Sequence, residues 1–166
     1  MIRPNCVYSR ANVETPWGNA DTLRERRLPP GRSGDRDAAR RDQRERLFAA
    51  MVAACAEKGY EATSVEDLLR ASGVSRATFY EQFDDKVSCF RAAEDEILAG
   101  AISAIAEELG RGDGDAAGRP RAALEAFVRV VVDQPAAARM CLVESYAAGD
   151  AGIDPVRRAI DWIVLL

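Results

Sequence analysis

Two short helices joined by a tight turn are predicted between residues 64 and 83, and this pair restricts the possible folds more than any other feature. Ser64 is a favourable N-cap residue, and Asp67 stands three residues later, where the acidic partner of a capping box belongs. The apolar residues of the first helix share one face, so this helix is expected to bury one side against a core. These residues are Val65, Leu68 and Leu69.

The second helix of the pair is predicted to follow a glycine turn and to carry polar groups outward. Gly73 suits the left-handed backbone that ends a helix, and Ser75 is the next N-cap candidate. Phe79 and Phe83 lie four residues apart and therefore point together into the core. The outward positions offer a guanidinium, a hydroxyl and a phenol, which suit base edges and phosphates. The pair is typical of a DNA-reading helix-turn-helix, although caps and apolar spacing alone also fit one corner of a three-helix bundle.

A third helix is predicted to start directly after the pair. Asp85 can cap it, which places Lys86 in its first turn. A positive charge at that position opposes the helix dipole, so helix stability does not explain the lysine. We therefore expect Lys86 to lie close to a DNA phosphate.

Many of these residues recur at the spacing of a known family pattern. The matching positions are Gly59, Tyr60, Thr63, Ser64, Val65, Ala71, Ser72, Gly73, Val74, Ser75, Thr78, Phe79, Tyr80, Phe83 and Lys86. The pattern resembles that of the tetracycline-repressor (TetR) family of bacterial transcription regulators over about residues 43–90. The resemblance implies an all-α chain in which a three-helix helix-turn-helix domain, residues 37–88, precedes a helical ligand-binding and dimerisation region, residues 89–166.

The expected DNA contacts come from the helix-turn-helix and from basic residues of the preceding helix. Gln82 stands where many family members have histidine, and Glu81 either accepts from a cytosine amino group or repels phosphate. The expected contact residues are Thr63, Ser64, Ser75, Arg76, Ala77, Thr78, Tyr80, Glu81, Gln82 and Lys86, together with Arg40, Arg41 and Arg44.

Positive charge gathers ahead of the helix-turn-helix, although the whole chain carries a net charge of −4. Residues 1–46 hold 11 arginines and 7 acidic residues, a net charge of +4. Residues 1–36 hold 4 prolines and no periodic pattern, so they are expected to form a disordered basic arm. This arm is either merely solvated or follows phosphates and the minor groove, and it can do both if it orders on DNA.

The C-terminal half is predicted to hold three further helices, at about residues 120–133, 135–147 and from Asp154 onward. In TetR-like proteins this region encloses a ligand cavity and supplies the dimer interface. The residues expected to line that cavity, or otherwise to form ordinary core, are Phe127, Val131, Met140, Val143, Tyr146 and Trp162. Glu144 and Arg139 are either polar anchors for a charged ligand or part of a solvated surface.

The chain ends on an apolar run, residues 162–166, without a capping residue. TetR-like proteins are usually longer and place the helices of their dimer interface beyond this point. We therefore expect the ligand-binding and dimerisation region to be truncated, which puts dimerisation in question. A single helix-turn-helix reads one half-site, whereas specific binding normally needs two.

The composition argues against an enzyme, a metal site and a membrane protein. The chain has no histidine, which removes Ser-His and Cys-His catalysis and argues against a zinc site. Its 4 cysteines form no CxxC pair, and Cys55 and Cys89 fall on apolar helix faces, as buried thiols do. No apolar run approaches the roughly 20 residues of a membrane span, and the N-terminus lacks the apolar core of a signal peptide. We expect a cytoplasmic protein with no cofactor, no metal and no membrane partner.

The sequence therefore predicts a DNA-binding transcription regulator, most simply a homodimeric repressor that a small-molecule ligand releases from a palindromic double-stranded operator. The alternative is a truncated paralogue that acts only as a protein-interaction partner, or is inactive because the dimerisation helices are missing. An α-helical enzyme is a third possibility, and no residue pattern supports it.

Overall fold

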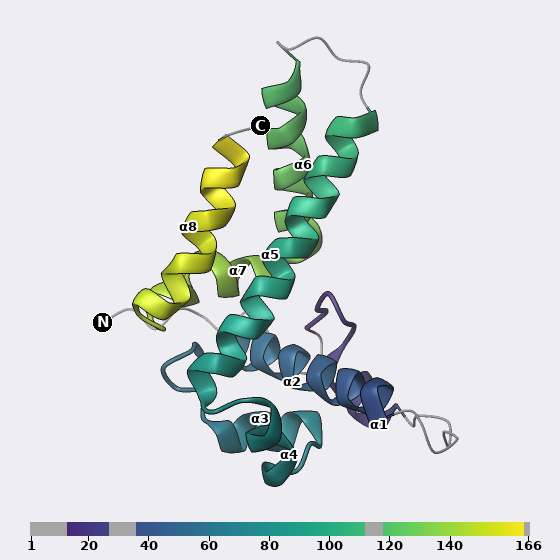
Figure 1. Ribbon diagram of the computed structural model, residues 1–166, viewed down its shortest axis with the longest axis vertical. Coiled ribbons are helices and arrows are strands. Elements are labelled where there is room, and N and C mark those ends of the chain that lie inside the picture. The colour runs from purple at the N-terminus through teal and green to yellow at the C-terminus, as the bar shows by residue number, and fades with distance from the viewer. Residues whose placement is uncertain (1–12, 27–35, 112–117, 165–166) are drawn as a thin grey trace.

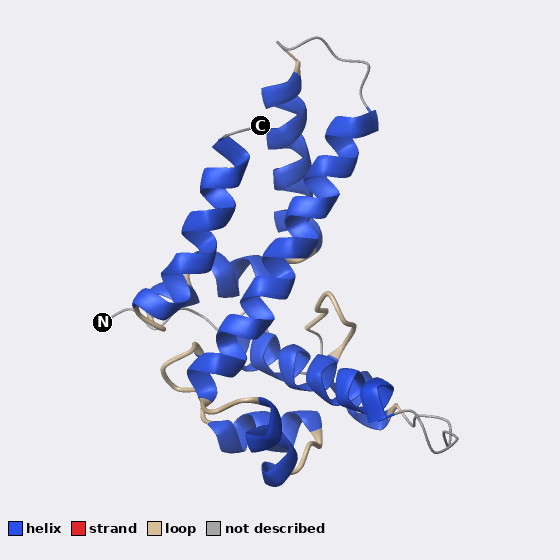
Figure 2. Ribbon diagram, in the orientation of Figure 1, coloured by secondary structure: helices blue, strands red, loops and turns tan. Residues whose placement is uncertain are grey.

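The computed structural model describes residues 13–26, 36–111 and 118–164, and in these ranges it contains helices and no strand (Figure 2). The all-α prediction is therefore confirmed. None of the described helices is long and apolar enough to cross a membrane. The helices are α1 (Ala20–Glu25), α2 (Arg36–Lys58), α3 (Val65–Ser72), α4 (Arg76–Gln82), α5 (Lys86–Arg111), α6 (Arg119–Asp133), α7 (Pro135–Leu142), the 3-10 helix η2 (Glu144–Tyr146) and α8 (Asp150–Val164).

The helices form a lower and an upper group that share α5 (Figure 1). In the lower group α2, α3 and α4 gather around the first turns of α5, and α1 lies beside one end of α2. In the upper group α6 and α8 pack along the rest of α5, while α7 contacts both α2 and α5. A displacement of α5 or α7 would therefore change the packing in both groups.

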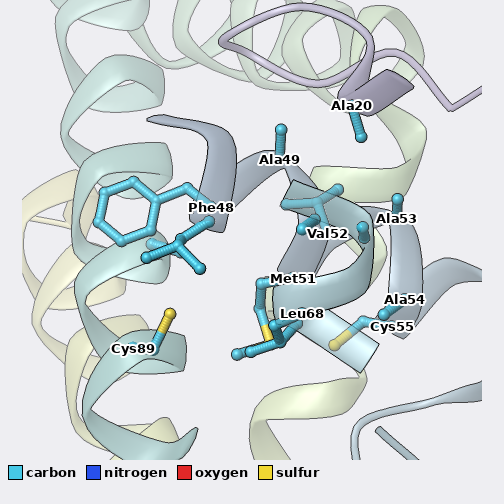
Figure 3. Packing of buried hydrophobic residues seen from close by; sticks show 14 of the residues in the cluster. Ala20, Phe48, Ala49, Met51, Val52, Ala53, Ala54, Cys55, Leu68 and Cys89 are labelled. Atoms are coloured by element: carbon cyan, nitrogen blue, oxygen red, sulfur yellow. The ribbon is translucent and has the colours of Figure 1, made fainter. Parts of the chain in front are cut away.

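Helix α2 lies at the centre of the core because its small side chains let neighbours pack against it from every side. All residues from Leu47 to Ala56 are buried, and five of these ten are alanine. Phe48 packs between Trp17 and Phe83, with ring centroids 5.2 Å and 5.9 Å away. Figure 3 shows buried side chains gathered around this helix.

The cysteines within the described ranges are buried thiols, as predicted for two of them. Cys55, Cys89 and Cys141 are free and buried. Burial raises the pKa of the Cys89 thiol to about 12 and also raises that of the other two. Since the thiolate is the reactive form, these side chains act as small apolar core residues.

The disordered arm predicted for residues 1–36 is wrong in part, because residues 13–26 form an ordered segment on the core, which we call the N-terminal strap. Val13 and Leu23 are buried, and Trp17 packs against the same core. The apolar residues of the strap are too few and too irregularly spaced to produce a detectable period, yet each covers apolar surface. The parts of the predicted arm that lie outside the described residues are 1–12 and 27–35.

The last helix begins earlier than predicted. Helix α8 starts at Asp150, after Gly149 turns with φ of +74°, so Pro155 lies inside the helix instead of at its first position. The backbone N–H of Gly152 donates to the Gly149 carbonyl and closes a first turn ahead of the proline. Because proline has no backbone N–H, α8 lacks the hydrogen bond that residue 155 would otherwise donate to the carbonyl four residues earlier.

Gly152 permits the close approach of α8 to η2, and replacing it with alanine is expected to destabilise the protein by about 1–3 kcal/mol. A Cβ at this position would lie 2.6 Å from the Ser145 carbonyl oxygen and 2.8 Å from the Ala148 Cβ. Gly100, in α5, has nothing within 4 Å of the same position. Gly100→Ala is therefore the matched control and should stabilise by about 0.5–1 kcal/mol through helix propensity. Urea denaturation of both variants checks this, and equal shifts would contradict it.

Candidate nucleic-acid interface

The first helix of the helix-turn-helix is held by the predicted capping box. Ser64 Oγ accepts from the Asp67 backbone N–H at 3.2 Å, and Asp67 Oδ2 accepts from the Ser64 backbone N–H at 2.9 Å. Lys58 Nζ donates to the same carboxylate at 2.5 Å, and this bond, followed by those from Ser64, holds the pKa of Asp67 well below its ordinary range. The turn then closes at Gly73, whose φ is +71°. The relative orientation of α3 and α4 is thus fixed by local bonds.

Helix α4 presents one face to the core and another to solvent. Ser75 caps it by accepting from the Thr78 backbone N–H at 3.1 Å. Phe79 is fully buried, and its ring centroid lies 5.7 Å from that of Phe83. Tyr80 is 49 % exposed and rests edge-on against Phe79. The expected contact residues that are exposed on or beside this helix are Ser75, Arg76, Ala77, Tyr80 and Glu81, while Thr78 and Gln82 are half-buried.

Two residues expected to contact DNA have structural partners instead. Thr63 is 2 % exposed, and its hydroxyl donates to the Gly59 carbonyl. Lys86 donates to the backbone carbonyls of Tyr60 and Thr63 at 3.0 Å and 2.8 Å, and its ammonium lies 4.0 Å from the Tyr60 ring centroid. These bonds account for a lysine in the first turn of α5, and a phosphate contact of Lys86 stays a prediction. Its charge is held at the first turn of α5 by carbonyl oxygens of the loop between α2 and α3, and sequence spacing does not reveal this.

The arginines expected to contact DNA differ in whether they form ion pairs with other side chains. Arg40 and Arg41 are exposed and form no ion pair with a described residue. Arg44 is held instead, because it lies over the Phe48 ring at 4.8 Å and pairs with Glu96 at 3.5 Å. Among the helix-turn-helix residues, Arg76 forms an ion pair with Glu66 of α3. The unpaired cations are the ones that can meet phosphates without losing a partner.

An open hollow of about 490 Å³ lies between the start of α2 and the end of α4. Gln82 Nε2 donates to Gln43 Oε1 across a long 3.5 Å contact. The Gln82 Oε1 is buried and has no hydrogen-bond partner in the described part of the chain. The hollow is therefore lined by polar groups, one of which lacks a hydrogen-bond partner, and it lies next to α4. Its lining residues are Arg36, Asp37, Ala39, Arg40, Gln43, Glu81 and Gln82.

The residues expected to line a ligand cavity do not share one environment. Met140 is fully buried, whereas Phe127 and Val131 are half-buried on α6. Val143 and Tyr146 are 57 % and 70 % exposed, so their assignment to a cavity lining is corrected. The predicted helix at 135–147 is divided at Val143, and this turn directs both side chains to solvent. The Trp162 side chain lies outside the described residues.

Glu144 and Arg139 are neither a ligand anchor nor a solvated surface in this structure. The Glu144 carboxylate is buried and accepts from the Tyr60 backbone N–H at 2.8 Å. Its other oxygen accepts from Arg139 Nε and Nη2 at 3.2 Å and 3.0 Å. This interaction connects η2 in the upper group to the loop between α2 and α3, and sequence analysis did not find it.

A second buried carboxyl group, Glu94 of α5, was also missed. Glu94 is fully buried, and its Oε1 lies 2.5 Å from Ser145 Oγ, while Oε2 has no partner among the described residues. The same hydroxyl lies 2.6 Å from the Cys141 carbonyl. One hydroxyl proton cannot serve both acceptors, so the contact with Glu94 fits a protonated carboxyl group. Burial accordingly raises its pKa to about 7. The sequence signal that could have revealed this buried group is an acidic residue within the apolar stripe of a predicted helix.

Comparison with family models matches residues 47–93 to the model described as bacterial regulatory proteins, tetR family. The matched segment runs from the buried centre of α2 through α3 and α4 into α5, and therefore contains the whole helix-turn-helix. A search of curated proteins finds no match to this chain.

Proposed function

We propose that the chain, which carries the DNA-binding domain of the bacterial regulatory proteins of the tetR family, is a DNA-binding transcription regulator of that family and a repressor released from its operator by a small molecule. Regulators of this family are not enzymes. We further propose that it works in the cytoplasm as a homodimer on a palindromic double-stranded operator, since two half-sites give the affinity that one helix-turn-helix lacks.

The observation that carries the DNA-binding part of the proposal is the division of α4 into two faces. Phe79 and Phe83 anchor the helix in the core, while Arg76, Ala77 and Tyr80 are exposed. These outward groups supply charge, a methyl group and a phenol at one helix end, which suits contacts with base edges and phosphates of the major groove. Ser64 and Ser75 are exposed beside them, but their hydroxyls also cap helices.

The contacts between the upper and lower groups support control by an effector. Glu144 joins η2 to the backbone N–H of Tyr60, and the Tyr60 carbonyl accepts from Lys86 at the start of α5. A ligand that favours one arrangement of the upper helices can therefore influence the helix-turn-helix through few intervening contacts, as allosteric coupling requires. Met140, Phe127 and Val131 remain the candidates for contact with that ligand.

Replacing Arg76 with alanine is expected to weaken binding to the preferred operator by about 1–3 kcal/mol and to relax sequence preference, because a base-reading cation is lost. Tyr80→Phe keeps the ring against Phe79 and removes one hydroxyl, so a smaller loss of about 1 kcal/mol is expected. Arg119→Ala, in an exposed α6 position, is the control and should change nothing. The operator is first selected from random double-stranded DNA, and affinities are then measured by fluorescence anisotropy. Wild-type protein that selects no sequence would refute the proposal.

A second candidate function, a protein-interaction partner, is favoured by one surface of α6. Leu124, Val128 and Val132 recur every four residues and are 63 %, 50 % and 68 % exposed. An apolar stripe of this kind is typical of a face that another helix covers. Light scattering at several concentrations separates the candidates, because a stable dimer supports the regulator and a monomer supports the interaction partner.

A further inference from the structure

We propose that the N-terminal strap belongs to the DNA-binding surface and that Arg24, at its end, contacts the phosphate backbone beside the groove that α4 enters. This inference rests on the proposed function. It adds to the expected contacts a residue that lies outside the matched family segment.

The strap is firmly held, so its arginine has a defined position. Trp17 packs on Phe48 with ring centroids 5.2 Å apart, and its indole N–H donates to Glu96 at 3.2 Å. Arg46 of α2 donates to the carbonyls of Arg24 and Arg26 at 3.1 Å and 2.5 Å. The Arg46 bonds fix the backbone at the C-terminal end of the strap, and the Trp17 contacts hold its middle. The backbone at Arg24 therefore needs no further ordering when this side chain binds.

The Arg24 side chain lies against the turn of the helix-turn-helix. Its Cγ and Nε would be 3.2 Å and 3.7 Å from a Cβ at Gly73, the residue that ends α3. Gly73 has no side chain, so the arginine stem can rest directly on the turn. Ser75, the N-cap of α4, follows two residues later. Arg24 is therefore adjacent to the end of α4 that carries the exposed polar groups.

The charge of Arg24 is free, unlike the other cations at this end of α4. Arg24 is exposed and forms no ion pair with a described residue. Arg76 pairs with Glu66, and Arg70 pairs with Asp67. Among the described residues, the guanidinium of Arg24 is thus a cation near the start of α4 that a phosphate can meet without displacing an acidic partner.

Free cations also lie at the opposite end of α4. Arg36 and Arg40 are exposed and line the hollow that Glu81 and Gln82 border. A seven-residue helix is about 10 Å long, close to the width of about 12 Å of the major groove. Cations at both ends of α4 can therefore meet the two phosphate backbones that border the groove.

The test measures the salt dependence of binding to an operator selected from random double-stranded DNA. Arg24→Gln keeps the stem on Gly73 and removes the charge. It should lower the slope of log affinity against log salt by about 0.9, the value of one phosphate contact, and weaken binding about five-fold at physiological salt. Arg24→Lys should restore most of the slope. Arg119→Ala, which removes an exposed and unpaired arginine of α6, is the matched control and should keep the wild-type slope.

The outcomes separate this inference from the proposed function. Wild-type protein that binds no DNA refutes both, whereas wild-type binding with an unchanged slope in Arg24→Gln refutes the inference alone. A thermal midpoint equal to that of the wild type shows that Arg24→Gln keeps the fold. If Arg24→Gln melts earlier than the wild type, the salt slope of Arg24→Lys is compared with that of the wild type. A slope that is also lowered in this charged variant means that Arg24 acts only structurally, which refutes the inference.

Discussion

Replacing Glu144 with alanine is expected to lower the free energy of unfolding by about 3 kcal/mol. The Glu144 side chain is 9 % exposed and holds two donors from different parts of the chain, the Tyr60 backbone N–H at 2.8 Å and Arg139 at 3.0 Å. Without the carboxylate, the N–H is left buried with no acceptor, and the arginine loses its counter-charge. Because the Arg139 side chain is 34 % exposed, water compensates part of that second loss.

Urea denaturation at neutral pH measures this effect, and two variants control it. Glu125 pairs with Arg121 at 2.8 Å on the surface, so Glu125→Ala removes a similar ion pair and should cost less than about 1 kcal/mol. Glu144→Gln keeps an oxygen that can accept from Tyr60 and should fall between the other two variants. If Glu144→Ala were as stable as Glu125→Ala, the connection between the upper and lower groups would be unimportant for folding.

The protein is expected to lose stability as the pH rises from about 5 to 7, and Glu94→Gln should abolish this loss. The ordinary pKa of a glutamate is 4.5, whereas burial raises that of Glu94 to about 7. Between these values the folded chain keeps a proton that the unfolded chain has released. The free energy of unfolding therefore falls with increasing pH in this window, by about 3 kcal/mol at most, and stays constant above it.

The pH dependence between about 5 and 7 is not overlaid by histidine titration, because the chain contains no histidine. The charged groups that face Glu94 are Asp95 and Arg91 on its own helix and Arg158 on α8. Glu125→Gln is the control, since Glu125 is exposed on α6 and is not among the groups that face Glu94, so it should leave the pH dependence in place. Urea denaturation from pH 5 to 8 provides the comparison. Wild-type and Glu94→Gln proteins with parallel stability profiles would show that the buried carboxyl group does not titrate in this range.

The helix-turn-helix was predictable because everything that defines it is local. The capping box of Ser64 and Asp67, the left-handed Gly73 and the buried Phe79 all involve residues within a few positions of one another. Such contacts leave a readable spacing in the sequence. The outward position of Tyr80 follows directly from the same spacing.

The features that could not be predicted depend on residues far apart in the chain. Tyr60 and Glu144 are separated by 84 positions, and Trp17 and Glu96 by 79. No periodicity in the sequence indicates such pairs, because each pair depends on a single polar side chain. The packing of distant segments determines the partner of that side chain. The carbonyl partners of Lys86 could not be predicted for the same reason, since a lysine that binds carbonyl oxygens and one that binds phosphate look identical in sequence.

The two faces of α4 have a consequence for how this protein can diverge. Its core-facing residue Phe79 supports the fold, while Arg76, Ala77 and Tyr80 contribute little to the interior. If α4 reads DNA as proposed, substitutions at the exposed positions should alter DNA preference at a small cost in stability. A duplicated gene can acquire a new regulatory target through a few such changes, and a library limited to these positions offers the shortest route to regulators with chosen targets.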